Sequence, residues 1–359
     1  MSKIILDRLG RAVKDLRISL IDRCNFRCTY CMPKEIFDNK YKFLTRSQLL
    51  SFAEIVQISE SFLSLGVEKL RLTGGEPLLR KNVCNLVREL KKLKTKNKVS
   101  PEVTLTTNGL LLGDMAKSLK GAGLDRVTVS LDSINQEIFQ KMIDKEFNPD
   151  LILASIDKSV NAGLQVKVNM VVKKGVNDSQ IIPMADYFKK KKIHLRFIEF
   201  MDVGNSNNWD MNFVVPTSSI LKLLDKKFGI SFVGKNAKSE VADTWLYKTG
   251  ESFGTISSVT KPFCGACSRA RISSDGKLYT CLFSSKGYEL KEILNKPLTN
   301  EEKVTQLKKY FAQVWAERVD KYSAGRSTNN KRNIEKKIEM SYIGGELLYS
   351  IFIIQWGRK

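Results

Sequence analysis

The chain contains the run Asp22-Arg23-Cys24-Asn25-Phe26-Arg27-Cys28-Thr29-Tyr30-Cys31-Met32-Pro33. An apolar, β-branched stretch at Leu16–Ile21 precedes this run and predicts a strand that leads directly into the cysteines. Their C-x3-C-x2-C spacing supplies three thiolates from one loop, whereas a [4Fe-4S] cluster normally takes four, so one iron is left to bind a small molecule. We expect S-adenosylmethionine at that iron. A zinc knuckle or a set of buried structural thiols is the alternative interpretation.

Similar strand-like stretches recur through the first two thirds of the chain, with amphipathic segments between them. They lie at Lys69–Thr73, Val103–Thr106, Arg126–Leu131, Gln165–Val172 and His194–Phe200. One intervening helix is expected to begin at an N-cap at Thr45 and to end at Gly66. This alternation predicts an α/β fold, a partial (β/α)6 barrel of the TIM type. Chemistry in such barrels gathers at the C-terminal ends of the strands, where the cysteine loop would lie.

The character of the chain changes after Met201, where a polar, turn-prone segment covers Gly204–Trp209. A helix near Thr217–Phe228 and several short strands are expected to follow. We therefore predict a barrel domain over residues 1–215 and a C-terminal α+β domain over residues 216–345 that caps the open side of the barrel, with residues 346–359 as an extension. The segment Ser323–Lys337, rich in Ser, Asn, Lys and Arg, is expected to be mobile.

A second set of cysteines, Cys264, Cys267 and Cys281, has the spacing C-x2-C-x13-C, with Arg269 and Arg271 just after the pair. Zinc would need a fourth ligand, and the remaining candidates, Cys84 and His194, lie in segments that read as regular barrel elements. The set therefore favours a second cluster with a vacant iron, and a zinc ribbon is the alternative.

The pairing of both three-cysteine motifs with Arg269-Ala270-Arg271 resembles the GTP 3',8-cyclases, the radical S-adenosylmethionine enzymes that begin molybdenum cofactor biosynthesis. The resemblance runs from about Leu6 to Gly345. It implies a lyase with two [4Fe-4S] clusters, S-adenosylmethionine as cofactor and GTP as substrate. In the implied reaction a 5'-deoxyadenosyl radical takes H3' of the GTP ribose, and C3' then attacks guanine C8 to give (8S)-3',8-cyclo-7,8-dihydroguanosine 5'-triphosphate.

Residues for the cofactor are expected around Gly74-Gly75-Glu76-Pro77, which follows the second predicted strand. Glycines there let the backbone approach a ligand, and carbonyls or Glu76 can accept hydrogen bonds from an ammonium group, although a plain tight turn would also use Gly-Gly. The resemblance implies S-adenosylmethionine contacts from Gly75, Tyr30, Ser130 and Met201. Ser130 and Met201 taken alone read as ordinary strand-end residues.

Cations for the substrate are expected on the strands, because inward charges there are costly unless they are paired or functional. Arginine suits a polyphosphate through its planar fork, and an ordinary salt bridge is the alternative for any single residue. The resemblance implies GTP contacts from Arg17, Arg71, Thr106, Lys167, Arg269, Ala270 and Arg271. It makes Arg17, Arg269 and Arg271 the catalytic residues. The chain has no G-x-x-x-x-G-K-[ST] loop, so GTP would be substrate rather than fuel.

The composition of the 359-residue chain agrees with a reducing compartment, because seven cysteines form no small-domain disulfide pattern. No signal peptide and no window of about 20 apolar residues is found, so we expect a cytoplasmic protein that does not bind membranes. The net charge of +22 comes largely from lysine runs without aromatic residues between them, which indicates solvated surface rather than nucleic-acid binding. The single histidine, His194, is expected to be structural, which disfavours Ser-His-Asp and His-metal chemistry.

The implied partners are an external one-electron reductant and a downstream cyclic pyranopterin monophosphate synthase. The oligomeric state stays open, and a homodimer is compatible with the sequence. Two other functions remain as alternatives. One is a radical S-adenosylmethionine enzyme that modifies a peptide and keeps an auxiliary cluster, and the other is a module that binds zinc and nucleic acid.

The end of the chain departs from the family, whose members usually finish in a Gly-Gly that reaches into the active site. Here Gly344-Gly345 is followed by 14 residues, many of them large and apolar. We hypothesise that this extension impairs insertion of the tail, and a harmless added element is the alternative.

Overall fold

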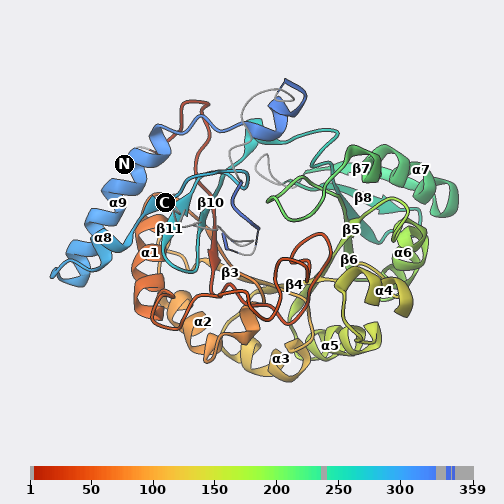
Figure 1. Cartoon of the computed structure of the whole chain (residues 1–359), viewed down its shortest axis with the longest axis horizontal. Helices are drawn as coiled ribbons and strands as arrows, with labels where there is room; N and C mark the ends of the chain where they lie inside the picture. The colour runs from red at the N-terminus through yellow and green to blue at the C-terminus, as the bar shows by residue number, and fades with distance from the viewer. Residues whose placement is uncertain (1–3, 236–240, 329–336, 341, 344–359) are drawn as a thin grey trace, which may run out of the picture.

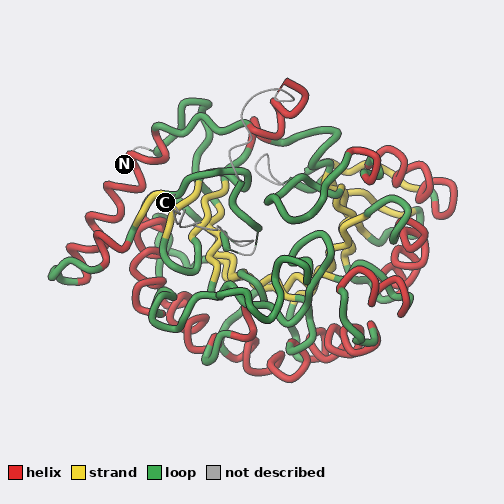
Figure 2. The backbone as a smooth tube through the Cα atoms, viewed as in Figure 1, coloured by secondary structure: helices red, strands yellow, loops and turns green. Residues whose placement is uncertain are grey.

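The protein forms an open barrel of strands surrounded by helices (Figure 1). The computed structural model describes residues 4–235, 241–328, 337–340, 342 and 343. Within this part of the chain one 12-stranded sheet has the order β12-β11-β10-β1-β2-β3-β4-β5-β6-β9-β8-β7. Figure 2 shows the strands on the inside and the helices on the outside of the curve.

The central strands are parallel and follow the predicted stretches, each ending within two residues of the expected position. They are β1 (Asp15–Ser19), β2 (Lys69–Thr73), β3 (Glu102–Thr107), β4 (Arg126–Ser130), β5 (Gln165–Val172) and β6 (His194–Glu199). The predicted α/β partial barrel is thereby confirmed.

The helices that lie between or follow the strands are α1 (Phe52–Ser64), α2 (Val83–Lys92), α3 (Leu112–Gly121), α4 (Gln136–Ile143), α5 (Pro149–Asn161), α6 (Ile181–Lys190), α7 (Thr217–Phe228), α8 (Lys291–Leu294) and α9 (Asn300–Ala316). Short 3-10 turns are η1 (Pro77–Leu79), η2 (Asp178–Gln180), η3 (Met211–Phe213), η4 (Cys264–Ala266) and η5 (Tyr322–Thr328). None of the helices in the described residues is long and apolar enough to cross a membrane.

The start of α1 differs from the prediction, because Ser51 rather than Thr45 is its N-cap. Ser51 Oγ accepts from the Glu54 backbone N–H at 3.2 Å, and the Ser51 N–H donates to Glu54 Oε2 at 2.6 Å. This reciprocal pair satisfies two backbone donors that a helix start otherwise leaves free. The predicted helix Thr217–Phe228 is confirmed as α7.

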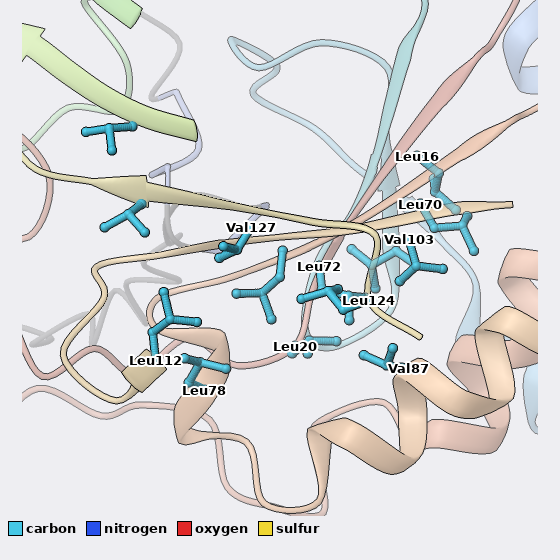
Figure 3. Packing of buried hydrophobic residues seen from close by; sticks show 14 of the residues in the cluster. Leu16, Leu20, Leu70, Leu72, Leu78, Val87, Val103, Leu112, Leu124 and Val127 are labelled. Carbon is cyan, nitrogen blue, oxygen red and sulfur yellow. The ribbon is translucent and has the colours of Figure 1, made fainter. Parts of the chain in front are cut away.

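Alternation along each strand separates an apolar outer face from a charged inner face. Leu16, Leu70 and Val103 are in register on neighbouring strands, and all three are fully buried. Figure 3 shows them packed with Val87 of α2 between the sheet and the helix. Each such side chain contributes about 1.5–3 kcal/mol by leaving water. Their strand neighbours, such as Arg17, consequently point into the barrel.

The second part of the chain extends both edges of the barrel sheet. On one edge β9 (Ser252–Ile256) pairs in parallel with β6, followed by β8 (Asp243–Tyr247) and β7 (Ile230–Gly234). On the other edge β10 (Arg269–Ile272) pairs in parallel with β1, followed by β11 (Lys277–Tyr279) and β12 (Tyr288–Glu289). The added strands thus continue the barrel instead of lying over it as a separate cap. The division near residue 215 stays a prediction.

Candidate functional site

A cavity of about 560 Å³ fills the barrel and is lined by all the cysteines of both motifs. The other expected site residues on its wall are Arg17, Tyr30, Arg71, Gly75, Thr106, Ser130, Lys167, Met201, Arg269 and Arg271. Ala270 is different, because its side chain is fully buried in the hydrophobic core and does not line the cavity. The implied contact of Ala270 with GTP stays a prediction.

The first cysteine loop lies beyond the C-terminal end of β1, as expected. Its turn is closed by the Cys31 N–H, which donates to the Cys28 carbonyl at 2.9 Å. The Thr29 N–H donates to the carbonyl of Met142 in α4 at 2.9 Å, and this bond ties the loop to the barrel. All three cysteines are half-buried, so their thiols face the cavity while the backbone is held.

The Gly-Gly-Glu-Pro turn packs directly against that loop. The Gly75 N–H donates to the Ile21 carbonyl at 2.8 Å. A Cβ at Gly75 would lie 2.2 Å from the Arg23 carbonyl oxygen, so only glycine fits without a backbone shift. Gly75 thus joins the second strand to the first cysteine loop, and the approach of this turn to a ligand stays a prediction.

Glu76 does not point at the cofactor space, and the expectation that its carboxylate could accept from a ligand is wrong. Its side chain is buried, with Oε1 accepting from the Leu78 N–H at 3.0 Å and from Thr107 Oγ1 at 2.8 Å. Oε2 accepts from the Asn108 N–H at 2.8 Å. Burial raises the pKa of Glu76 to about 7, against the lowering effect of these hydrogen bonds. The residue links two strand-end loops, which leaves backbone carbonyls as the acceptors for an ammonium group.

Tyr30 is held by a buried carboxyl group that sequence reasoning missed. Tyr30 Oη donates to Asp132 Oδ2 at 2.7 Å, and Asp132 Oδ1 accepts from the Val171 N–H at 2.8 Å. Burial raises the pKa of Asp132 to about 6, although both hydrogen bonds lower it. Asp132 follows β4 two residues after Ser130, at the same end of the barrel, and this position was the available signal.

The second cysteine set lies at the opposite end of the barrel from the first. Arg269, at the start of β10, pairs with Asp15 at the start of β1, so Cys267 lies beyond the N-terminal ends of both strands. The antiparallel β11 pairs Tyr279 with Arg271, and its chain direction returns Cys281 to the same end. The two cysteine sites therefore face each other along the length of the cavity.

The thiol pKa differs between two cysteines of the second set, Cys267 and Cys281. Burial raises the pKa of the Cys267 thiol, but the guanidinium groups of Arg269 and Arg318 outweigh it and bring the pKa to about 6. Arg269 Nη2 donates to Cys267 Sγ at 3.2 Å. Burial raises the pKa of Cys281 to about 11. At neutral pH Cys267 is thus a thiolate, the form that binds iron.

The wall between the two cysteine sites is strongly cationic. The Nε–H groups of Arg17, Arg71 and Arg269 are buried and have no hydrogen-bond partner within the described part of the chain. Arg71 Nη1 donates to Thr106 Oγ1 at 3.3 Å. Asp15 lies among these cations, and although burial raises its pKa, Arg17 and its cationic neighbours lower it below the ordinary value. Buried donors without partners are costly, by about 1–3 kcal/mol each, unless a ligand completes them.

His194 was expected to be structural, and Cys84 was expected to lie in a regular barrel element. His194 Nδ1 lies 2.9 Å from Ser252 Oγ, yet the ring also lines the cavity. Burial and the nearby Lys167 and Arg196 lower the pKa of His194 to about 3, so its imidazole is neutral. Cys84 is half-buried and packs against the core, and burial raises its pKa.

Several cavity residues were missed, and some of them had a readable signal. Asp15 lies two residues before Arg17, and Lys69 two before Arg71, so strand alternation places each pair on the same inner face. Arg11 and Arg318 also line the cavity, but they lie outside the strands and no pattern in the sequence marks them.

A segment near the end of the described chain bridges the two margins of the open barrel. Glu339 Oε1 accepts from the Asn205 N–H at 2.7 Å and its Oε2 accepts from Ser206 Oγ at 2.8 Å, in the loop after β6. Tyr342 donates to Asp275 in the turn between β10 and β11. Between these anchors Met340 lines the cavity. We call residues 337–340, 342 and 343 the strap. Residues 329–336, part of the expected mobile segment, and the extension after Gly345 lie outside the described residues.

Within the described residues, no three cysteine, histidine or carboxylate side chains converge closely enough to hold a single metal ion.

Two family descriptions match successive parts of the chain. Residues 18–188 match the radical SAM superfamily, and residues 193–324 match the family described as Molybdenum Cofactor Synthesis C.

Curated relatives match almost the whole chain. A protein of Staphylococcus epidermidis named GTP 3',8-cyclase is 48% identical over 348 residues, which cover 96% of this chain and 100% of that protein. A Staphylococcus aureus protein of the same name is 45% identical over the same share of both chains. Among solved structures, Streptococcus suis SuiB bound to S-adenosylmethionine has a TM-score of 0.58 at 16% identity, covering 90% of this chain and 69% of that one. This last likeness shows a shared fold.

Proposed function

Because the chain belongs to the GTP 3',8-cyclase family, we propose that its cavity holds S-adenosylmethionine at the first cysteine site and GTP between the two sites. The product is (8S)-3',8-cyclo-7,8-dihydroguanosine 5'-triphosphate, the first intermediate of molybdenum cofactor biosynthesis. The observation that carries the assignment of GTP to this cavity is the set of buried arginine donors without partners between two opposed cysteine triads.

The first site suits a [4Fe-4S] cluster, since Cys24, Cys28 and Cys31 are half-buried, line the cavity and belong to one braced loop. When bound, the cluster supplies the electron that cleaves S-adenosylmethionine into methionine and a 5'-deoxyadenosyl radical. The protein's task is to aim that radical at the ribose of GTP and to exclude water from the path.

The cofactor lies against the strand ends that surround the first loop. Gly74 and Gly75 line the cavity beside the first cysteine loop, so their backbone carbonyls would accept hydrogen bonds from the methionine ammonium group. Tyr30, fixed by Asp132, together with Ser130 and Met201, completes the contact set.

The triphosphate binds the cationic wall. Arg17, Arg71 and Arg269 each keep a buried Nε–H donor for it, and Lys167 adds a further positive charge on β5. Thr106 is held toward the same space by Arg71. Arg271 lies on the same inner face of β10, two residues beyond Arg269. Charge-assisted contacts of this kind fix the nucleotide so that C3' can approach C8.

The second site holds its own [4Fe-4S] cluster through Cys264, Cys267 and Cys281. The low pKa of Cys267 supports thiolate ligation at neutral pH. Three cysteines leave one iron for the guanine base, which would hold the purine while the arginines hold the phosphates.

The reaction also needs partners outside the chain. These partners are an external one-electron reductant and a downstream cyclic pyranopterin monophosphate synthase. A cytoplasmic location fits this chemistry. The sequence is compatible with a homodimer. The seven cysteines, which form no small-domain disulfide pattern, support a reducing compartment.

The test is anaerobic incubation of reconstituted protein with S-adenosylmethionine, reductant and GTP deuterated at C3'. The abstracted atom should appear in 5'-deoxyadenosine. The nucleotide product should elute apart from GTP. Its mass should equal that of unlabelled GTP, because C3' loses its deuterium and N7 gains an ordinary hydrogen. Unlabelled 5'-deoxyadenosine with unchanged GTP would refute the proposed cyclisation.

A further inference from the structure

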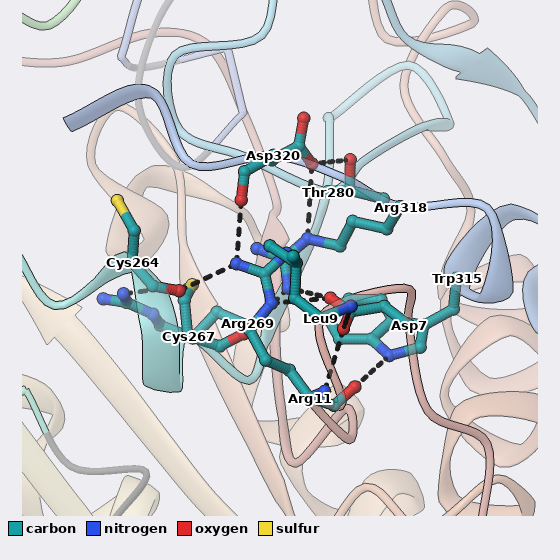
Figure 4. A network of polar contacts seen from close by, with 10 residues as sticks. All are labelled: Asp7, Leu9, Arg11, Cys264, Cys267, Arg269, Thr280, Trp315, Arg318 and Asp320. Carbon is teal, nitrogen blue, oxygen red and sulfur yellow. Dashed lines mark hydrogen bonds and ion pairs between the residues drawn. The ribbon is translucent and has the colours of Figure 1, made fainter. Parts of the chain in front are cut away.

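Four charged residues surround the second cysteine set and come from segments far from it in the sequence. Asp7 and Arg11 precede β1, and Arg318 and Asp320 follow α9. Figure 4 shows them gathered around Cys264 and Cys267. We call this group the arginine clamp.

The clamp forms hydrogen bonds to the backbone carbonyls of Cys264 and Cys267, and to the side chain of Thr280, the residue before Cys281. Arg11 Nη1 donates to the Cys264 carbonyl at 2.7 Å and to the Asp320 carbonyl at 2.8 Å. Arg318 Nη1 donates to the Cys267 carbonyl at 2.8 Å. Asp320 Oδ2 accepts from the hydroxyl of Thr280, which precedes Cys281, at 2.5 Å. One connected network thus touches all three ligand positions.

Asp7, Arg11 and Arg318 form a buried ionic group within the clamp, whereas the Asp320 side chain is partly exposed. Asp7 Oδ2 accepts from Arg11 Nε at 2.6 Å and lies 3.4 Å from Arg318 Nη1, and all three side chains are almost completely buried. Buried ions are retained only when they are paired and hydrogen-bonded, and removing one partner is strongly destabilising. The arrangement is consequently stiff.

Trp315 adds a rigid support from α9. Its Nε1 donates to the Arg11 carbonyl at 2.9 Å, and the Arg318 guanidinium lies 4.6 Å from a ring centroid of the indole. Both arginines are therefore held in place by groups other than the cysteines.

We propose that Arg11 and Arg318 are positioning residues that preset the second cysteine set for its cluster, an inference that rests on the second cluster proposed above. By fixing the carbonyls of Cys264 and Cys267, they hold the two thiols toward the cavity before iron arrives. Their positive charges also offset the negative charge of a cluster bound by three thiolates. Arg11 Nη2 is buried without a partner in the described residues, so it keeps one donor for the occupant of this site.

The experiment uses two parent proteins that isolate the clusters. One carries Cys24→Ala, Cys28→Ala and Cys31→Ala and keeps only the second site, and the other carries Cys264→Ala, Cys267→Ala and Cys281→Ala and keeps only the first. Arg11→Lys and Arg318→Lys are introduced into each, and iron release to a chelator is followed by absorbance after anaerobic reconstitution. Lysine keeps the charge but cannot form the same forked contacts.

We expect the lysine variants to lose iron from the second site about 10- to 100-fold faster than the parent, the range typical of residues that orient metal ligands. Release from the first site should be unchanged. Arg8→Lys is the matched control, because Arg8 is exposed in the same segment as Arg11.

Three outcomes would overturn the inference, and they can be told apart. If the parent with only the second set held no iron, the second cluster itself would be refuted. If that parent held iron and the lysine variants released it at the same rate, only the clamp would be refuted. Equal acceleration at both sites would indicate general destabilisation and would remove the specific positioning role.

Discussion

The first cysteine site comes from one continuous loop, whereas the second is assembled from parts of the chain that lie far apart. Cys24, Cys28 and Cys31 follow a single strand and are braced mainly by backbone hydrogen bonds and by the close packing of Gly75. Cys264, Cys267 and Cys281 are brought together by a hairpin and braced by buried charges from both ends of the described chain.

This contrast matches the different demands on the two ends of the cavity. The loop that meets S-adenosylmethionine needs carbonyl oxygens and space, which a glycine-rich backbone provides. The end proposed to receive GTP would need positive charge, and Arg269, Arg318 and Arg11 line the cavity there.

The largest effect should come from the ligands of the two clusters. Changing Cys24, Cys28 and Cys31 to alanine should remove about half the iron and abolish 5'-deoxyadenosine formation. Changing Cys264, Cys267 and Cys281 should remove a similar share of iron yet spare some cofactor cleavage. Iron analysis and chromatography measure both, and near-total loss of iron in either protein would contradict two separate sites.

Removing a single arginine from the second end should weaken the binding of GTP without changing the binding of S-adenosylmethionine. Arg269→Ala or Arg271→Ala should cost GTP binding or productive cyclisation about 1.5–3 kcal/mol, because each loses a charge-assisted contact. Calorimetric titration with GTP and with S-adenosylmethionine separates the two ligands, and cofactor affinity should be kept. An exposed arginine change, Arg8→Ala, is the control. Unchanged GTP affinity together with unchanged product yield would take these residues out of the site.

A pair of glycine changes tests the bracing of the two loops. Gly75→Ala should lower the free energy of unfolding by about 1–3 kcal/mol and weaken cofactor binding, because the new Cβ would lie 2.2 Å from a carbonyl oxygen. Gly265→Ala, in the second loop, meets no atom within 4 Å and should be nearly silent. Urea unfolding of both variants provides the comparison. A Gly265 variant as unstable as the Gly75 variant would show that the two loops do not differ in this way.

The extension after Gly345 gives a smaller test, at residues outside those that the structure describes. Ending the chain at Gly345 should increase cyclisation if the added residues obstruct insertion of the tail. Product formation by the truncated and the full-length proteins is compared under the same reconstitution. Equal or lower activity after truncation would show that the extension does not obstruct the site.

A different kind of test concerns the acid response of the cationic wall. The pKa of His194 is about 3 in the folded protein and near 6.5 in an unfolded chain. The unfolded state therefore binds a proton first, and stability should fall as pH drops from about 6.5 toward 3, by at most about 1.4 kcal/mol per pH unit from this group. His194 is the only histidine, so its ring resonances can be followed directly by NMR. A ring that becomes protonated near pH 6 in the folded protein would be inconsistent with this environment.

The parts of the molecule that were predictable are those set by local patterns. β-branched runs identified the central strands, and cysteine spacing identified both sites. The start of α1 was missed although Ser51 and Glu54 form a recognisable capping box, because Thr45 was taken as the cap. Glu76 was misjudged because its partners, Thr107 and Asn108, come from another strand end.

The arginine clamp, and the position of the two cysteine sites at opposite ends of the cavity, could not be predicted from local sequence patterns. The parallel register of Asp15 with Arg269 joins distant positions and depends on closure of the whole barrel. Arg11 and Arg318 gain their meaning only from the backbone carbonyls that they meet. Composition and periodicity carry no information on such contacts.

The strap also sets an order of events during synthesis. Its bonds from Glu339 to Asn205 and Ser206 connect residues 134 and 133 positions apart, so they cannot form until long after the loop beyond β6 has left the ribosome. All the strands and both cysteine sites precede residue 337, and they are available to fold before the strap exists. Until that last segment docks, the loop after β6 and the turn between β10 and β11 lack the bonds that Glu339 and Tyr342 make to them, so both cysteine sites can form before the strap joins these two margins.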